Sequence, residues 1–212
     1  MVVLGLGRFG TSLARELVRR GTDVLGIDTD PLLVQRYAEE ITHTAVADTT
    51  DVESLRQLGV PEYRRAVVGI GTDLEASILT TAVLVDLGIP HIWAKATSRQ
   101  HGRILDRVGA HHVVLPEHEM GERVAHLVTG RMIDYIKFED DFAMVKTTAP
   151  GELVDRSLAD SRVRRRHRIT VVGIKRRGEE FTYATQDTVV RAADMLIVSG
   201  RIDDVEAFAD RT

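Results

Sequence analysis

Three glycines near the start of the chain have the spacing of a phosphate-binding turn. Gly5, Gly7 and Gly10 form a G-x-G-x-x-G sequence between an apolar run and an amphipathic stretch. Gly5 allows a tight turn, Gly7 allows a pyrophosphate to approach the backbone, and Gly10 allows close packing of helix on strand. Arg8 and Phe9 lie between the second and third glycines, and the predicted helix that this segment opens offers free N–H groups to phosphate. The pattern predicts a nucleotide site.

Two charged residues indicate which parts of a nucleotide would be bound. Asp28 ends the second apolar run, where a carboxylate accepts hydrogen bonds from ribose hydroxyls and disfavours a 2′-phosphate. Arg8 places a cation at the turn, which suits a third phosphate or a phosphate shared across a dimer interface. The alternative is an exposed arginine paired with a nearby carboxylate. Thr11 stands where a P-loop has lysine, so hydrolysis is not expected.

Other candidate residues follow predicted strands, at the edge where such sheets bind ligands. They are Asp48, Thr49, Thr50, Gly71, Thr72, Asp73 and Lys95. The first three are placed to meet the adenine. For Asp48, Thr49 and Thr72 the alternative is helix capping, which the same residue types perform. An adenine nucleotide is the predicted ligand.

These residues need elements that bring them to one edge. From Met1 to about Pro116, short β-branched runs alternate with amphipathic stretches, which is typical of βαβ units and a parallel sheet. The predicted strands are Val2–Leu6, Asp23–Asp28, Thr44–Ala47, Ala66–Ile70, Ile92–Ala96 and His112–Leu115. Five helices are predicted between them from the 3.6-residue spacing of apolar residues. The fold class is therefore α/β, with a Rossmann-like doubly wound parallel sheet over residues 1–117.

The pattern changes after this domain. Apolar residues at helical spacing predict a long helix from Glu117 to about Tyr135, a connecting crossover helix over 118–136. Four short strands are then predicted, at Phe142–Thr147, Thr170–Lys175, Phe181–Thr185 and Met195–Ser199, before a helix from Asp203. We predict a smaller α+β domain over 137–212, whose marginal size favours dimerisation.

Composition excludes several classes of protein. The 212 residues are 43% hydrophobic and 28% charged, as in ordinary globular domains, and the net charge of −4 gives no general attraction for nucleic acid. The absence of cysteine excludes disulfides, thiol catalysis and thiolate metal sites. No apolar stretch approaches the roughly 18 to 20 residues that cross a bilayer.

A nicotinamide dinucleotide is the alternative ligand, because the same glycine turn and acidic residue bind NAD(H). The chain would then be an NAD(H)-binding oxidoreductase or an NAD(H)-sensing regulator. Its length leaves little room for a substrate domain, which disfavours the oxidoreductase. If the chain is an oxidoreductase, we expect substrate-dependent turnover of NADH. If it is a regulator, we expect NADH to bind without turnover.

Several segments resemble the RCK family (regulator of K⁺ conductance), most closely its Ktr/Trk potassium-uptake regulators. They are V-V-L-G-L-G-R-F-G at 2–10, I-D-T-D at 27–30, A-D-T-T at 47–50, G-A-H-H-V-V-L-P-E at 109–117, V-V-G-I-K-R at 171–176 and A-D-M-L-I-V-S-G at 193–200. The resemblance covers nearly the whole chain. It implies homodimers assembled into a cytosolic octameric ring that binds ATP or ADP, or NAD(H) in some members. The ring would be cytoplasmic and gate a separate potassium-translocating subunit at the inner face of the membrane.

The resemblance also implies roles for single residues. Arg8 matches an arginine that reaches the γ-phosphate of a neighbouring subunit. Glu117 matches a glutamate that holds Mg²⁺, Ca²⁺ or Na⁺ beside that phosphate, as a hard oxygen ligand can. Asp30 stands where close relatives often have an amide that contacts nucleotide, and A-D-T-T replaces their G-D-A-T. These two departures predict a changed phosphate preference and changed adenine contacts.

A basic cluster lies in the predicted second domain, beside His167. It contains Arg162, Arg164, Arg165, Arg166 and Arg168. Such a run is usually a solvated surface, but a dimer cleft lined by it would attract a dianionic nucleotide. Because some members of the resembled family bind cyclic di-AMP in this domain, that ligand is a further hypothesis.

Overall fold

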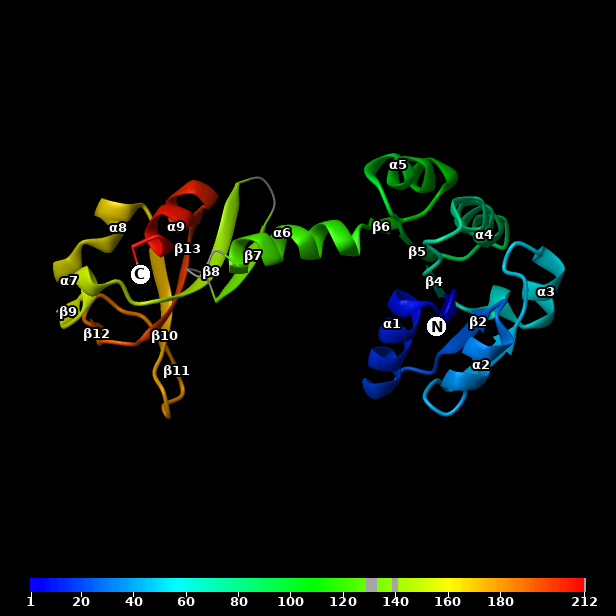
Figure 1. Ribbon diagram of the computed structural model, residues 1–212, viewed down its shortest axis with the longest axis horizontal. Coiled ribbons are helices and arrows are strands. Elements are labelled where there is room, and N and C mark those ends of the chain that lie inside the picture. The colour runs from blue at the N-terminus through cyan, green and yellow to red at the C-terminus, as the bar shows by residue number, and fades with distance from the viewer. Residues whose placement is uncertain (129–132, 139–140, 212) are drawn as a thin grey trace. The chain divides into compact units, whose positions relative to one another are not determined.

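The computed structural model describes residues 1–128, 133–138 and 141–211, and the chain divides into two compact units, Met1–Glu117 and His118–Thr212 (Figure 1). The first unit contains a parallel sheet with helices, and the second contains a smaller antiparallel sheet with helices. The predicted fold class is confirmed. No helix in the described parts of the chain is both long and apolar enough to cross a membrane.

Six parallel strands form the sheet of the first unit, in the order β3-β2-β1-β4-β5-β6. They are β1 (Val2–Leu4), β2 (Leu25–Asp28), β3 (His43–Val46), β4 (Arg65–Val68), β5 (His91–Lys95) and β6 (His112–Val114). The connecting helices are α1 (Arg8–Arg19), α2 (Pro31–Tyr37), α3 (Val52–Gln57), the short η1 (Val60–Glu62), α4 (Leu74–Asp86) and α5 (Arg99–Val108). All six predicted strands are confirmed. The strand order reverses between β1 and β4, which is where doubly wound sheets bind ligands.

Apolar clusters cover both faces of this sheet. Val2 and Leu4 point into one cluster together with Leu84 of α4, and Val3 points into the other with Ala14 of α1. All of these side chains are fully buried, as expected for a central parallel strand between two layers of helices.

On the face of the sheet that packs against α1, the side chains become more exposed toward β6. The register aligns Val3, Val67, Trp93 and His112 across four neighbouring strands. Val3 and Val67 are buried, whereas Trp93 is 40% exposed. Its ring stacks on that of His112, with the centroids 4.1 Å apart.

Five strands form the main sheet of the second unit, in the order β11-β10-β13-β8-β7, and all its pairs are antiparallel. They are β7 (Asp134–Lys137), β8 (Phe142–Thr148), β10 (Thr170–Lys175), β11 (Phe181–Tyr183) and β13 (Met195–Arg201), while β9 (Arg156–Ser157) pairs with β12 (Val189–Val190). The remaining elements are α6 (Pro116–Val128), η2 (Gly151–Leu153), α7 (Leu158–Ser161), α8 (Val163–His167) and α9 (Ile202–Ala209). The four predicted strands and the last helix are confirmed.

The predicted helix up to Tyr135 is wrong at its end. α6 spans Pro116–Val128, and Tyr135 lies in β7, where its partner across the pair is Val145 of β8. Tyr135 is buried against this sheet, so tertiary packing overrides the helical spacing of the apolar residues. Residues 129–132, which the same prediction covered, lie outside the described residues.

Candidate functional site

The glycine turn joins β1 to α1 at the carboxyl end of the sheet. Gly5 has φ of +93°, and a Cβ on it would lie 2.9 Å from Ile70 Cγ1. A Cβ on Gly10 would lie 1.8 Å from the Gly5 carbonyl oxygen, so any side chain there would separate α1 from β1. Around Gly7, by contrast, there is nothing within 4 Å of the Cβ position. Gly5 and Gly10 therefore serve the fold, while Gly7 leaves open space.

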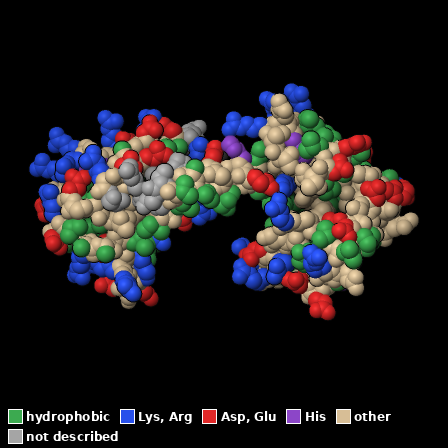
Figure 2. Space-filling model, viewed as in Figure 1, with side chains coloured by type: hydrophobic (Ala, Val, Ile, Leu, Met, Phe, Trp, Pro, Cys, Tyr) green, Lys and Arg blue, Asp and Glu red, His purple; other side chains and the backbone are tan. Residues whose placement is uncertain are grey.

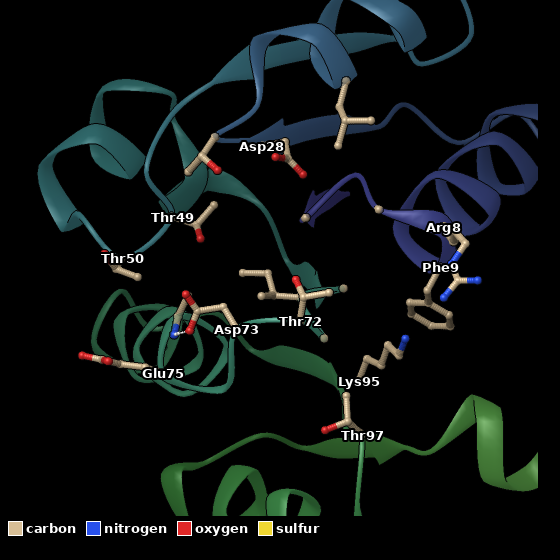
Figure 3. Close-up of a pocket in the computed structure, with 18 of the residues that line it drawn as sticks. Arg8, Phe9, Asp28, Thr49, Thr50, Thr72, Asp73, Glu75, Lys95 and Thr97 are labelled. Atoms are coloured by element: carbon tan, nitrogen blue, oxygen red, sulfur yellow. Dashed lines mark hydrogen bonds between the residues drawn. The ribbon is translucent and has the colours of Figure 1, made fainter.

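A cleft of about 690 Å³ opens beside this turn, within the first unit (Figure 3). The predicted site residues that line it are Gly5, Gly7, Arg8, Phe9, Asp28, Asp48, Thr49, Thr50, Gly71, Thr72, Asp73, Lys95 and Glu117. Gly10 and Asp30 do not line it. Asp30 is the N-cap of α2, where its Oδ1 accepts a hydrogen bond of 2.8 Å from Leu32 N.

Other residues complete the wall of the cleft. They are Thr29, Leu33, Gly69, Ile70, Glu75, Ala76, Leu79 and Thr97. Leu33 lies in α2 and Leu79 in α4, and helical spacing alone does not distinguish a core side chain from one that faces a ligand. Glu75 and Leu79 lie in the first two turns of α4, so extending the strand-end rule by two helical turns would have found them.

The Asp28 carboxylate is fixed against the glycine turn. Its Oδ2 accepts a hydrogen bond of 2.6 Å from Leu6 N, and its Oδ1 accepts one of 2.9 Å from Asp30 N. A carboxylate has about four acceptor positions. The remaining ones are free to accept hydroxyl hydrogens from a ribose, and Figure 3 shows the side chain turned into the cleft.

The loop after β3 is organised by its own side chains. Asp48 Oδ1 accepts hydrogen bonds from Thr50 N at 2.9 Å and Thr50 Oγ1 at 2.8 Å. Thr49 is buried, with its hydroxyl 2.7 Å from that of Thr80 in α4. The loop therefore has a fixed shape beside the cleft without any ligand contact.

Asp48, Thr49 and Thr72 do not cap the helices that follow them. The N-cap of α3 is Asp51 and that of α4 is Asp73, and each side chain accepts hydrogen bonds from backbone N–H groups of its helix. The capping alternative for Asp48, Thr49 and Thr72 is therefore wrong, since the next acidic residue in each loop performs that role.

Cationic side chains lie at the other end of the cleft. Lys95 Nζ is 2.5 Å from Glu117 Oε1 and 5.7 Å from the centroid of the Phe9 ring. The hydrogen bond from Lys95 lowers the pKa of Glu117, with a smaller contribution from the charge of Arg8. Arg8 is exposed and forms no ion pair with any described residue, so its guanidinium is open to an anion.

Glu117 fits a hard cation as one ligand only. Among the described residues, no group of three or more His, Cys, Asp or Glu side chains could hold a metal ion. Mg²⁺ and Ca²⁺ take about six to eight oxygen ligands, so phosphate oxygens, waters or a second chain would have to supply the others. The Glu117 side chain is 66% exposed at the cleft, which leaves room for such partners.

The arginine cluster of the second unit is divided by its contacts. Arg162, Arg164 and Arg165 line a separate cavity of about 380 Å³, whereas Arg166 pairs with Glu152 at 3.2 Å. Arg168 is the C-cap of α8, with φ of +55°. Figure 2 shows Lys and Arg side chains gathered over α8. Three of the five arginines therefore face a hollow.

A parallel doubly wound sheet with a glycine turn, a fixed acidic residue after β2 and a cleft at the reversal of strand order defines a Rossmann-type nucleotide-binding domain. Residues 1–116 match the TrkA-N domain, and residues 142–212 match the TrkA-C domain. The chain belongs to the TrkA family of RCK proteins. The resemblance to Ktr/Trk proteins is confirmed.

Relatives of nearly equal length support this assignment. Ktr system potassium uptake protein C of Bacillus subtilis (strain 168) is 35% identical over 99% of this chain and 95% of its own length. Protein A of the same system in that organism is 34% identical over 97% of this chain and 93% of its own length. Ktr system potassium uptake protein A of Vibrio alginolyticus is 31% identical over 95% of this chain and 92% of its own length.

Solved structures show the same fold at low identity. The GsuK RCK domain matches with a TM-score of 0.66 and 18% identity, over 99% of this chain and 46% of that one. A GsuK channel bound to NAD matches with a TM-score of 0.65 and 17% identity, over 96% and 37%. This chain thus spans less than half of either GsuK chain.

Proposed function

We propose that this chain is a cytosolic nucleotide-binding regulatory subunit of a potassium-uptake system, acting by binding rather than catalysis. The observation that carries the proposal is the glycine turn with its fixed Asp28, facing one cleft in a chain that is related to Ktr potassium uptake proteins over nearly its full length. Proteins with a similar fold have been solved with NAD and with ADP, which supports an adenine nucleotide as the ligand.

In this proposal ATP and ADP bind the same cleft. Asp28 holds the ribose, the loop Asp48–Thr50 meets the adenine, and the α1 N-terminus with Gly7 receives the phosphates. Only ATP presents a γ-phosphate to Arg8 of a neighbouring subunit. A ligand shifts a conformational equilibrium by its different affinity for the two states, so this added contact would favour one state of the assembly.

A thermal-unfolding series tests the ligand. A molecule that binds only the native state raises the midpoint, so ATP and ADP are expected to raise it and Asp28→Ala to lose most of that effect. Arg36→Ala, at an exposed position of α2, is the matched control. A response to NADH alone would favour the NAD(H)-sensing alternative, and NADH turnover with a substrate would favour an oxidoreductase.

The assembly belongs to the same proposal. Homodimers would form an octameric ring that binds a membrane-embedded potassium-translocating subunit, placing the chain at the cytoplasmic face of the membrane. Light scattering on the purified protein with ATP tests the ring. A mass of eight chains is expected, and a mass of one chain at micromolar concentration would contradict it.

Two further ligands, which the family resemblance implies, belong to the same proposal. A divalent cation or Na⁺ would bind Glu117 together with the terminal phosphate. Cyclic di-AMP would bind the cavity of the second unit, because Arg162, Arg164 and Arg165 face it. Isothermal titration is expected to give heat that Arg164→Ala reduces and Arg166→Ala does not, because Arg166 pairs with Glu152, as His167 also does, and does not line the cavity. Absence of heat with the wild-type chain would exclude this ligand.

A further inference from the structure

Lys95 is an enclosed cation with hydrogen-bond donors to spare. Its side chain is 11% exposed and lies over Gly71, whose Cβ position is 3.3 Å from Nζ. An ammonium group has three N–H donors, and among the described residues the hydrogen bond of Lys95 goes to Glu117. Burial has removed most of its hydration, so the remaining donors need acceptors from a ligand. Figure 3 shows this side chain extending toward Phe9, at the phosphate turn.

In the free protein, Lys95 thereby neutralises the charge of Glu117 through one of its two oxygens. The ammonium of Lys95 lies 2.5 Å from Oε1, which is where an inorganic cation would also sit. Two cations on one carboxylate repel each other, and at a few ångströms this repulsion is substantial even near a protein surface. An inorganic cation that approaches Glu117 is therefore repelled by Lys95, unless Lys95 moves away or a further anion offsets its charge.

We propose that Lys95 is a tethered cation that makes cation binding at Glu117 depend on a phosphate in the cleft. Without ligand, Lys95 and Glu117 neutralise each other. A terminal phosphate accepts the donors of Lys95 and draws it from the carboxylate, which is then free to bind an inorganic cation together with that phosphate. The inference rests on the proposed function, because the phosphate is that of the bound nucleotide. Since coupling between two sites is reciprocal, the cation must raise nucleotide affinity by the same factor.

The test compares Lys95→Met with wild type in the full-length chain. Met preserves the apolar stem and removes the charge, and Lys95→Gln serves as a second variant if the first does not fold. Lys95→Arg keeps a positive charge at the site, so Mg²⁺ without nucleotide is expected to leave its unfolding midpoint unchanged. Lys137→Met removes an exposed lysine of β7 and is the matched control.

The first measurement uses Mg²⁺ without nucleotide. Mg²⁺ is expected to leave the unfolding midpoint of wild type and Lys137→Met unchanged and to raise that of Lys95→Met. Adding Glu117→Gln to Lys95→Met should abolish the gain. Equal responses of wild type and Lys95→Met would overturn the proposal, whether or not any nucleotide binds.

The second measurement is the Kd of ATP with Mg²⁺ and with a chelator. Mg²⁺ is expected to tighten binding at least fivefold more in wild type than in Lys95→Met, because the variant no longer couples the two ligands. The metal complex of ATP in solution is the same for every variant, so it cancels from this comparison. An unchanged ratio in Lys95→Met would overturn the proposal, whereas a wild-type chain that binds no nucleotide would refute the proposed function and leave the first measurement to decide on Lys95.

Discussion

Charged side chains divide the cleft into two halves with different ligand preferences. The phosphate half carries Arg8 and Lys95 near Glu117, and the other half carries Asp28, Asp48, Asp73 and Glu75. Carboxylates accept hydrogen bonds from hydroxyl and amino groups and repel phosphate. The cleft thus favours a nucleotide whose phosphates all lie at one end, and it disfavours a phosphate on the adenosine ribose.

Arg8→Ala is expected to weaken ATP binding more than ADP binding. A charge-assisted hydrogen bond contributes about 1.5–3 kcal/mol, so the loss for ATP should be roughly 10- to 100-fold if Arg8 meets the γ-phosphate. Titration of both nucleotides measures it. Arg15→Ala, which removes an arginine of α1 that pairs with Glu40, is the control. Equal losses for ATP and ADP would exclude the γ-phosphate role.

His101 makes the first unit sensitive to acid. Its side chain is 3% exposed, and burial lowers its pKa. The unfolded chain, with an ordinary histidine pKa near 6.5, therefore binds more protons than the folded one just below that pH, and stability falls as the pH drops through this window. Unfolding midpoints between pH 7.5 and 5.5 should fall less steeply in His101→Asn than in wild type. The same slope in both would show that His101 is not the responsible group.

At the scale of elements, two glycines where β1 joins α1 are expected to have different roles: Gly10 is needed for stability and Gly7 for nucleotide binding. Gly10→Ala places a methyl group 1.8 Å from the Gly5 carbonyl oxygen, so we expect a loss of about 3 kcal/mol or more of unfolding free energy. Gly7→Ala meets no atom and has φ of −65°, so its loss should stay within about 1 kcal/mol, while nucleotide affinity falls at least tenfold. Denaturation and titration measure both effects. Full affinity in Gly7→Ala would show that phosphate does not approach this residue.

Elements with a strong local pattern could be predicted from the sequence. The buried strands of the first unit are apolar runs bounded by turn residues, and the edge where they end correctly indicated Asp28 and Lys95 as cleft residues. β7 was missed because it comes directly after a stretch with helical spacing, and the predicted helix was extended into it. Its strand conformation is specified only by pairing with β8. The pair of Lys95 and Glu117 joins residues 22 positions apart, and no local pattern encodes such a contact.

At the scale of the whole molecule, each unit has its own core and its own cavity. Every residue that lines the nucleotide cleft lies within Met1–Glu117, and the cavity with the three arginines lies within His118–Thr212. The two kinds of anionic ligand would therefore bind different units.

A fragment of residues 1–128 is therefore expected to bind ADP within about threefold of the full-length Kd, since threefold is less than 1 kcal/mol. Calorimetric titration measures it, and circular dichroism establishes that the fragment is folded. A folded fragment without ADP affinity would show that the second unit contributes to the cleft.

The half-exposed ring of Trp93 also gives the molecule a built-in optical reporter. It is the single tryptophan of the chain, and it lies on β5 two residues before Lys95. When only indole is excited, the fluorescence therefore comes from the first unit alone. The imidazole of His112 stacks on this ring, so the fluorescence would register a rearrangement of this sheet edge, close to the nucleotide cleft, without any added label.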